Sequence, residues 1–438
     1  MIARVLTRSS VVLVVAAGAA AAYLSSSPEL SVPASATYSI TPPGPVVACP
    51  GPQYVPVGSV GTGGDLASVP TDREFEVFSP VTTTPAGDGQ IADTEVASQM
   101  ERIGDGDIEG WSATSCGQPE LDQWLVGGAT VLGSSARLVL TNPSGAPTEA
   151  TVTIYGPLGL VQDTLVVPVA AGAQDDRLLE AVSAELPAMV IRVTATGPGV
   201  VASLQDSRLE GFQPAGTEWV ARSDLAETLV IPAVGTADAN ATATLRLMSP
   251  EGATVDLSLV SDEGIESWSV GSAFSLEPGV VTDIELPSGL KGAIEVRADA
   301  PVVAAARTVV PREPREAITG DVAYDHMWVS GEALVDGTLT GVLPFEGARV
   351  AVYSPTNARV TVTDAGGATV GEADLKARTV QWIDVAAPAG TVLSTTGEFA
   401  WAFVMESDDG YIASSAPVLV SQGDLTATVT AARYPAGR

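Results

Sequence analysis

The sequence predicts an all-β protein made of about three tandem β-sandwich-like domains after an N-terminal signal or anchor helix. First, its apolar runs are short, alternate with polar residues and end at Gly, Pro, Asn or Asp, as strands and turns do. Second, a two-strand motif recurs three times at a spacing close to the length of one β-sandwich. Third, 438 residues are too many for one ordinary hydrophobic core.

The first 24 residues predict export. Arg4 and Arg8 precede an uncharged run from Ser9 to Leu24. As a helix this run would span roughly 24 Å, which fits either a signal peptide or an uncleaved membrane anchor. Residues 25–44 then form a linker, and the chain beyond it is expected outside the cytoplasm, either membrane-anchored or secreted.

The two cysteines, Cys49 and Cys116, are predicted to form one disulfide, because an even pair in an exported chain usually does. A metal site would need further ligands, and neither cysteine has another Cys or a His nearby in the sequence. Closing a loop of roughly 67 residues stabilises a fold by about 4 kcal/mol in the chain-entropy model. The bond would tie the N-terminal segment to the first repeat.

The repeated motif is a strand, a corner at Pro143, Pro250 or Pro355, and a second strand. Pro fixes φ at the corner, and the preceding Asn or Ser can bond the local backbone, so the corner needs no ligand. A second element follows each proline by roughly 52 to 58 residues and is interpreted as a hairpin. A tryptophan precedes each copy and is interpreted as a core or inter-domain plug: Trp124, Trp219 and Trp328.

These repeats predict three domains, over residues 45–222, 223–330 and 331–438. The segment between Cys49 and Cys116 matches the motif poorly. It is interpreted as extra strands added to the first domain, and a separate small domain is the alternative.

The charge balance argues against nucleic acid as a partner. Asp and Glu number 52 against 21 Lys and Arg, which gives a formal net charge of −31. A nucleic-acid-binding protein neutralises phosphates with clustered cations, and this sequence has no such cluster. Anionic lipid headgroups would also be repelled, except by the short basic N-terminus.

No catalytic motif or cofactor motif stands out. His326 is the only histidine and is interpreted as a surface or inter-domain residue, and the sequence has neither a G-x-S-x-G turn nor a Gly-rich phosphate loop. Two carboxylates suffice to hydrolyse a glycoside, but 52 acidic residues place pairs side by side without any function. The sequence therefore predicts no enzyme, no cofactor and no catalytic residue.

A short acidic stretch resembles the first half of a calcium loop. Asp105, Asp107 and Glu109 alternate before Gly110, but the twelfth position, which should hold a bidentate Glu, is Cys116. The stretch is interpreted as an acidic loop, no metal site is predicted, and calcium binding by these three residues stays open.

A longer stretch carries a family resemblance: "SCGQPELDQWLVGGATVLGSSARLVLTNPSGAPTEATVTIYG", with a Cys, a Trp, a Gly-Gly pair and an Asn142-Pro143 turn. It resembles the opening of an actinobacterial family of exported proteins of unknown function, and the later "VVAS" and "GTEW" elements extend the similarity. The resemblance implies a membrane-anchored, β-rich protein that is often encoded beside a membrane glycosyltransferase. It therefore implies an association with cell-envelope glycan assembly, without a known activity.

These observations predict a non-catalytic extracytoplasmic cell-envelope protein, a scaffold whose partners are other envelope proteins. The alternative is a set of glycan-binding modules for cell-wall glycan, and a carboxylate-dependent glycosidase is the third hypothesis. Exposed, coplanar rings of Trp111, Trp268, Trp382 and Trp401 would favour glycan binding, and buried rings would favour the scaffold. The specific partner and the oligomeric state stay open.

Overall fold

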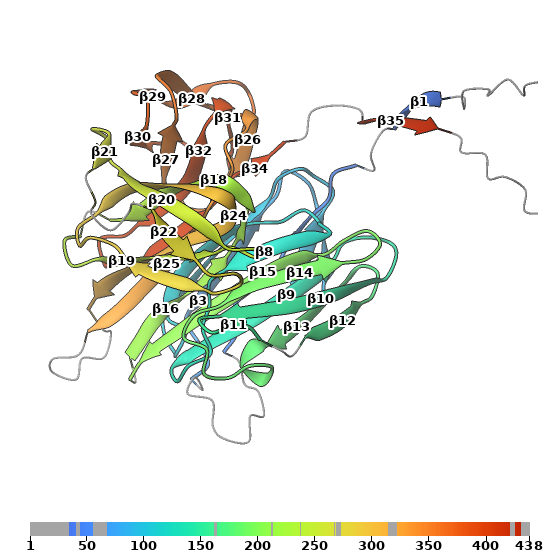
Figure 1. Ribbon diagram of the computed structural model, residues 1–438, viewed down its shortest axis with the longest axis horizontal. Coiled ribbons are helices and arrows are strands. Elements are labelled where there is room, and N and C mark those ends of the chain that lie inside the picture. Colours follow the sequence, from blue (N-terminus) through green and yellow to red (C-terminus); the bar gives the residue numbers. More distant parts are fainter. Residues whose placement is uncertain are drawn as a thin grey trace, which may run out of the picture. The chain divides into compact units, whose positions relative to one another are not determined.

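The computed structural model describes residues 35–40, 44–55, 68–161, 164–211, 213–236, 238–266, 268, 273–313, 322–420 and 425–430. The predicted signal or anchor segment lies outside these residues. The described chain is almost entirely β, with one short 3-10 turn, η1 (Leu179–Ala181), so the predicted all-β class is confirmed (Figure 1). Its residues fall into two compact units. In one, β1 (Ser35–Ile40) pairs antiparallel with β35 (Leu425–Thr430); the other, Gly44–Ser421, is described below.

The larger unit contains one strand order three times. The first repeat comprises β8 (Asp122–Val126), β9 (Ser134–Asn142), β10 (Thr148–Gly156), β12 (Leu165–Val169), β13 (Ala173–Leu178), β14 (Val190–Ala195), β15 (Val201–Glu210) and β16 (Gln213–Val220). One sheet has the order β12-β10-β14-β8 and the other the order β13-β9-β15-β16. The short strands β11 (Gly159–Leu160) and β17 (Arg222–Ser223) extend the first sheet.

The second repeat comprises β18 (Ala226–Gly235), β19 (Thr242–Met248), β20 (Ala253–Val260), β21 (Ile265–Glu266), β22 (Phe274–Leu276), β23 (Thr282–Glu285), β24 (Lys291–Arg312) and β25 (Ala323–Ser330). The third comprises β26 (Asp336–Val342), β27 (Arg349–Ser354), β28 (Ala358–Asp364), β29 (Thr369–Leu375), β30 (Thr379–Asp384), β31 (Val392–Glu398), β32 (Ala400–Glu406), β33 (Ile412–Ser415) and β34 (Val418–Leu419). Their sheets read β22-β20-β24-β18 and β23-β19-β24-β25, then β29-β28-β31-β26 and β30-β27-β32-β33, the order of the first repeat.

The proline corners join the two sheets of a sandwich and are not hairpins. In the first repeat, β9 pairs with β13 and β15, whereas β10 pairs with β12 and β14. The corner is satisfied locally: Asn142 Nδ2 donates to the carbonyls of Ala146 and Val169, at 2.8 and 3.2 Å. Alternation and turn residues locate strands and bends, but they do not specify which strand pairs with which.

The second shared element differs among the repeats, although each copy was predicted to be a hairpin. In the first repeat its strands, β14 and β15, belong to opposite sheets. In the second it is the single 22-residue strand β24, whose first half pairs with β18 and β20 and whose second half pairs with β19 and β25. Only the third copy, β32 and β33, is a hairpin.

The strands before Cys116 pair with one another. They are β2 (Val47–Cys49), β4 (Thr83–Ala86) and β5 (Gly89–Ala92) in one sheet, and β3 (Arg73–Phe78), β6 (Ser98–Ile103) and β7 (Gly110–Ser115) in another. These strands form two small sheets. Their assignment, either to the first domain or to a separate small domain, stays a prediction. Cys49 and Cys116 form a disulfide, with their Cα atoms 4.3 Å apart, and a bridge between Ala48 and Gly117 continues this link.

Apolar packing continues from one repeat to the next. Met248 and Trp328 of the second repeat pack in the same core cluster as Leu138 of the first, and Ala402 of the third packs with the core of the second. The three repeats are therefore joined within one compact unit. The boundaries at residues 222 and 330 stay a prediction.

Candidate functional site

Two polar regions lie where the repeats meet, and we call them the polar junction and the cleft. The junction is formed by Asp206, Glu218, Asp325 and His326 together with the strands β7, β16, β25 and β33. The last three are the closing strands of the three repeats. β16 packs against β25 and β7, and β33 packs against β25 and β7.

Two carboxylates of the junction bridge the edges of β7 and β33. Asp325 Oδ2 accepts hydrogen bonds from the backbone N–H groups of Trp111 and Ile412, at 3.2 and 3.0 Å. Glu218 likewise bridges the two strands, two residues further along each: it accepts from the N–H groups of Ala113 and Ser414, each at 3.2 Å. Both carboxylates also accept from the N–H of the following residue, at 3.0 and 2.8 Å. A buried strand edge needs partners for its N–H groups, and here side chains supply them.

His326 and Asp206 connect the first repeat to the second. The His326 Nδ1–H donates to the carbonyl of Ala215, at 2.8 Å, and His326 Nε2 lies 3.7 Å from an Asp206 oxygen. Asp206 accepts hydrogen bonds from the Arg208 guanidinium, at 2.7 and 3.0 Å, and from Trp328 Nε1, at 2.8 Å. The histidine is fully buried between repeats, in agreement with the inter-domain interpretation.

Burial sets the protonation behaviour of the junction. It raises the pKa of Asp325 to about 8, and it raises the pKa of Glu218 well above its ordinary value. Burial likewise lowers the pKa of His326 to about 4. Burial also opposes ionisation of Asp206, but Arg208 and the other positive groups outweigh it and hold its pKa well below the usual range.

Two glycines allow this close packing. Gly216 has a positive φ of +90°, which favours glycine, and a Cβ there would lie 2.5 Å from Asp325 Oδ1. A Cβ at Gly110 would lie 2.8 Å from the same oxygen. The junction therefore has no room for a side chain at either position.

The cleft is a cavity of about 540 Å³ to which the N-terminal segment and all three repeats contribute. Its charged residues are Glu120, Arg222, Asp224 and Glu332. Arg222 pairs with two of them: its Nε lies 3.1 Å from Glu120 Oε1, and a terminal nitrogen lies 2.6 Å from Asp224 Oδ1. These side chains keep access to solvent, since about a third of Glu120 and half of Arg222 is exposed.

The cleft carries more negative than positive charge, with three carboxylates around one guanidinium. Burial raises the pKa of Glu332 well above its ordinary value, and the Asp224 charge adds to this effect. Burial is also the main cause that raises the pKa of Glu120, and Asp224 again contributes. Arg222 thus engages two of the three carboxylates of the cleft.

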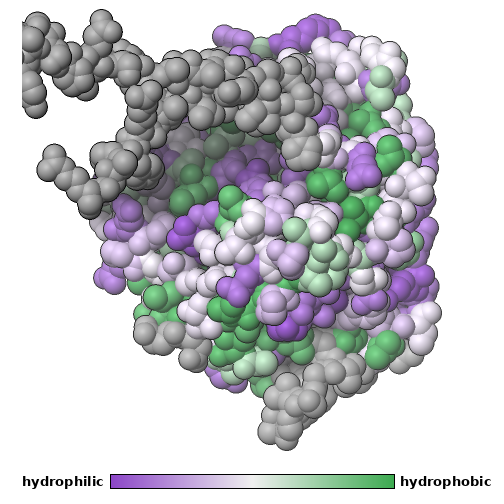
Figure 2. Space-filling view, turned by 90° about the vertical axis from the view of Figure 1, so that its right-hand side faces the viewer, coloured by the Kyte–Doolittle hydropathy of each residue, from purple (hydrophilic) through white to green (hydrophobic). Residues whose placement is uncertain are grey.

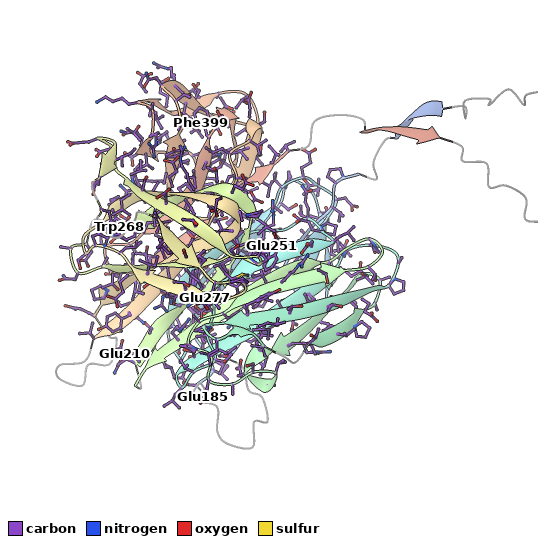
Figure 3. The ribbon with its side chains drawn as sticks, in the orientation of Figure 1. Glu185, Glu210, Glu251, Trp268, Glu277 and Phe399 are labelled. Atoms are coloured by element: carbon purple, nitrogen blue, oxygen red, sulfur yellow. A yellow bond between two sulfur atoms is a disulfide. The ribbon has the colours of Figure 1, made fainter. Side chains whose placement is uncertain are left out.

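The cleft also has apolar lining residues, most of them from the third repeat. Val335 and Leu419 are 44% and 43% exposed, and Leu225 of the second repeat is 41% exposed. Phe399, labelled in Figure 3, is buried and also lines the cleft. On the face shown in Figure 2, hydrophobic residues lie in small groups among hydrophilic ones. The cleft thus combines an acidic side with an apolar side.

The acidic residues proposed from sequence are not gathered into one site. Asp105 accepts from the Thr71 and Asp72 N–H groups, Asp107 accepts from the Ser68 N–H, and Glu109 binds Arg312 and Tyr411. Within the described residues, no three His, Cys, Asp or Glu side chains are grouped to hold a metal ion.

The four discriminating tryptophans form no exposed row. Trp401 is fully buried, and Trp268 packs against the apolar core. Trp111 stacks between Phe345 and Tyr411, with ring centroids 5.6 and 5.4 Å away. Trp382 lies under Lys291 and Arg349, whose charged groups are 4.4 and 5.3 Å from its ring centre. This arrangement gives glycan stacking little support.

Sequence reasoning singled out His326 of the junction but missed its carboxylates and the charged residues of the cleft. Glu218 and Asp325 lie within the closing strands, and a charged residue inside an alternating strand is the only local signal they give. Glu120, Asp224 and Glu332 lie next to strand ends in three separate stretches, so only the folded chain brings them together.

In the described part of the chain, no helix has the length and apolar character required to cross a membrane.

Comparisons with known proteins give a family and no activity. No curated protein matches the chain. A solved structure described as "Biofilm associated protein - BSP domain" is similar over 85% of this chain and 68% of its own, at 11% identity and a TM-score of 0.15. A second, "Crystal structure of tetra-tandem repeat in extending region of large adhesion protein", covers 84% of this chain and 94% of its own, at 12% identity and a TM-score of 0.09. A family model matches residues 69–395, well over half of the chain, and the chain therefore belongs to the family of unknown function DUF5719.

Proposed function

We propose that this protein is a non-catalytic scaffold of the cell envelope, located outside the cytoplasm and anchored or secreted through its N-terminal segment. The observation that carries the proposal is the polar junction. Asp325 and Glu218 fix the edges of β7 and β33 against the closing strands of the first two repeats. Such a block presents surfaces in a fixed geometry, which suits assembly of other proteins.

Two further features support this function. The disulfide between Cys49 and Cys116 fits an oxidising compartment. The polar cluster at the junction is engaged in backbone and ion-pair contacts, which is the arrangement of a structural element. The link to envelope glycan assembly rests on the sequence resemblance alone and belongs to the proposal in that form.

Location and assembly can be tested together in cells of the native host. The full-length chain carrying Leu132→Cys, an exposed position away from the cleft, is treated with a membrane-impermeant thiol reagent. We expect labelling in intact cells, and chemical cross-linking should then join the chain to envelope proteins. Labelling only after lysis would contradict the location. Absence of any cross-linked envelope protein would contradict the scaffold, and saturable binding to protein-stripped cell wall would favour the glycan-binding alternative.

A further inference from the structure

The cleft has the chemistry of a recognition site for a positively charged, partly apolar segment. Its acidic side holds Glu120, Asp224 and Glu332 around one arginine, so one guanidinium or ammonium group would improve the local charge balance. Burial, with a contribution from the Asp224 charge, raises the pKa of both Glu120 and Glu332, and a cation bound beside them would favour their ionised forms.

The apolar side of the cleft specifies the rest of the ligand. Leu225, Val335 and Leu419 are each more than 40% exposed, although they lie beside one cavity. Exposed apolar side chains that line one concave site are typical of binding surfaces. A bare cation would leave them in contact with water. A ligand with apolar groups next to its positive charge would cover them.

The edge of a sheet suggests an extended ligand. β34, which contains Leu419, is the last strand of its sheet, where it pairs with β26. Among the described strands it has one neighbour, so it forms an edge of this sheet. Extended peptides bind such edges through main-chain hydrogen bonds, while side-chain pockets supply specificity.

We propose that the cleft binds an extended peptide segment of a partner protein, in which a lysine or arginine is flanked by apolar side chains. The basic side chain reaches the carboxylates of Glu332, Glu120 and Asp224, and the apolar side chains cover Val335 and Leu419. This inference rests on the proposed scaffold function, because it names the type of partner that the scaffold would hold.

The test is a selection of random dodecapeptides displayed on phage against the full-length chain. We expect enrichment of peptides that combine Lys or Arg with apolar neighbours. Their synthetic copies should bind about tenfold or more weakly to Glu332→Gln and to Leu419→Ser. The control variants, Glu372→Gln and Leu132→Ser, change comparable exposed residues outside the cleft and should keep wild-type affinity. Selected peptides without basic residues, or equal binding to all variants, would overturn the inference, as would a selection with no binder.

A second variant separates loss of binding from loss of structure. Val335→Arg adds a guanidinium at an exposed position of the cleft, where it should occupy the carboxylates itself. We expect it to melt like the wild type and to bind the selected peptides about tenfold more weakly. Undiminished binding by this variant would overturn the inference. If envelope proteins cross-link equally to wild type and to Val335→Arg, the scaffold function is supported and the peptide site in the cleft is contradicted. If the peptides bind but no envelope protein cross-links, the peptide site is supported and the scaffold function is contradicted.

Discussion

The polar junction and the cleft both contain Asp and Glu side chains, but these carboxylates have different roles in the two regions. In the junction, Asp325 and Glu218 are fully buried, and backbone N–H groups of β7 and β33 occupy their oxygens. In the cleft, Glu120 and Asp224 share one arginine at the rim of a cavity and keep contact with solvent. A carboxylate surrounded by backbone donors holds strands together, whereas one beside an open cavity can still accept a new cation.

Removal of a junction carboxylate should have the largest effect. Asp325→Ala leaves three buried backbone N–H groups without their acceptor, and we expect the free energy of unfolding to fall by about 4 kcal/mol or more. Glu332→Ala in the cleft serves as the comparison. It removes the acceptor of a single backbone N–H, that of Trp401, and should lower the free energy of unfolding by about 1 to 2 kcal/mol. Urea unfolding of both variants measures the difference. Equal losses would mean that the two regions do not differ as described.

Crowding of the junction should have the next largest effect. Gly216→Ala places a Cβ 2.5 Å from Asp325 Oδ1, in addition to the strain of a positive φ, and should lower the free energy of unfolding by about 3 kcal/mol. Gly211→Ala is the matched control, because φ there is also positive, at +65°, but a Cβ would meet no atom within 4 Å. It should lose only about 1 kcal/mol. If both variants melt alike, the glycine at 216 serves its backbone conformation alone.

The pH dependence of stability should follow the buried acids. Asp325, with a pKa of about 8, and Glu101, with a pKa of about 7 because burial outweighs the Arg73 charge, bind protons more tightly in the folded chain than in the unfolded one. Their contribution is therefore present at low pH and is lost as the pH rises toward these values. Together the two groups should lower the free energy of unfolding by roughly 4 kcal/mol between pH 6 and pH 8.

His326 limits the gain on the acidic side. Its pKa of about 4 means that the unfolded chain takes up this proton first, so its contribution is lost as the pH falls from about 6.5 to 4. Thermal melts at half-unit intervals of pH measure the profile. Asp325→Asn, which keeps a carbonyl acceptor without the titration, should flatten it above pH 6.5. Stability that rises from pH 6 to pH 8 would argue that Asp325 is ionised in the folded protein.

The smallest effect is expected for a neutral replacement in the cleft. Glu332→Gln removes one negative charge beside Asp224 and keeps an oxygen that can accept from the Trp401 N–H. We expect the free energy of unfolding to change by less than about 1 kcal/mol, with any change at pH 8 in the stabilising direction. Urea titrations at pH 6 and pH 8 measure it. A loss of about 2 kcal/mol would place Glu332 with the structural carboxylates.

The sequence predicts strands better than it predicts their partners. The motif around Pro143, Pro250 and Pro355 locates the same two strands in all three repeats, because alternation and corner residues are local properties. Whether β9 pairs with β10 or with β15 depends on contacts between distant residues, and so does the sheet change within β24. The cleft is still harder to predict from the sequence, because Glu120, Asp224 and Glu332 belong to no motif and come together only when the repeats pack.

Hydrogen exchange resolved to single backbone amides tests the central claim most directly. The N–H groups of Trp111, Ala113, Ile412 and Ser414 lie on strand edges, yet they donate to Asp325 and Glu218. The account predicts that these four amides exchange as slowly as those in the paired strands β9 and β15. Exchange as fast as in exposed loops would contradict it, since the repeats would then not be held together through these carboxylates.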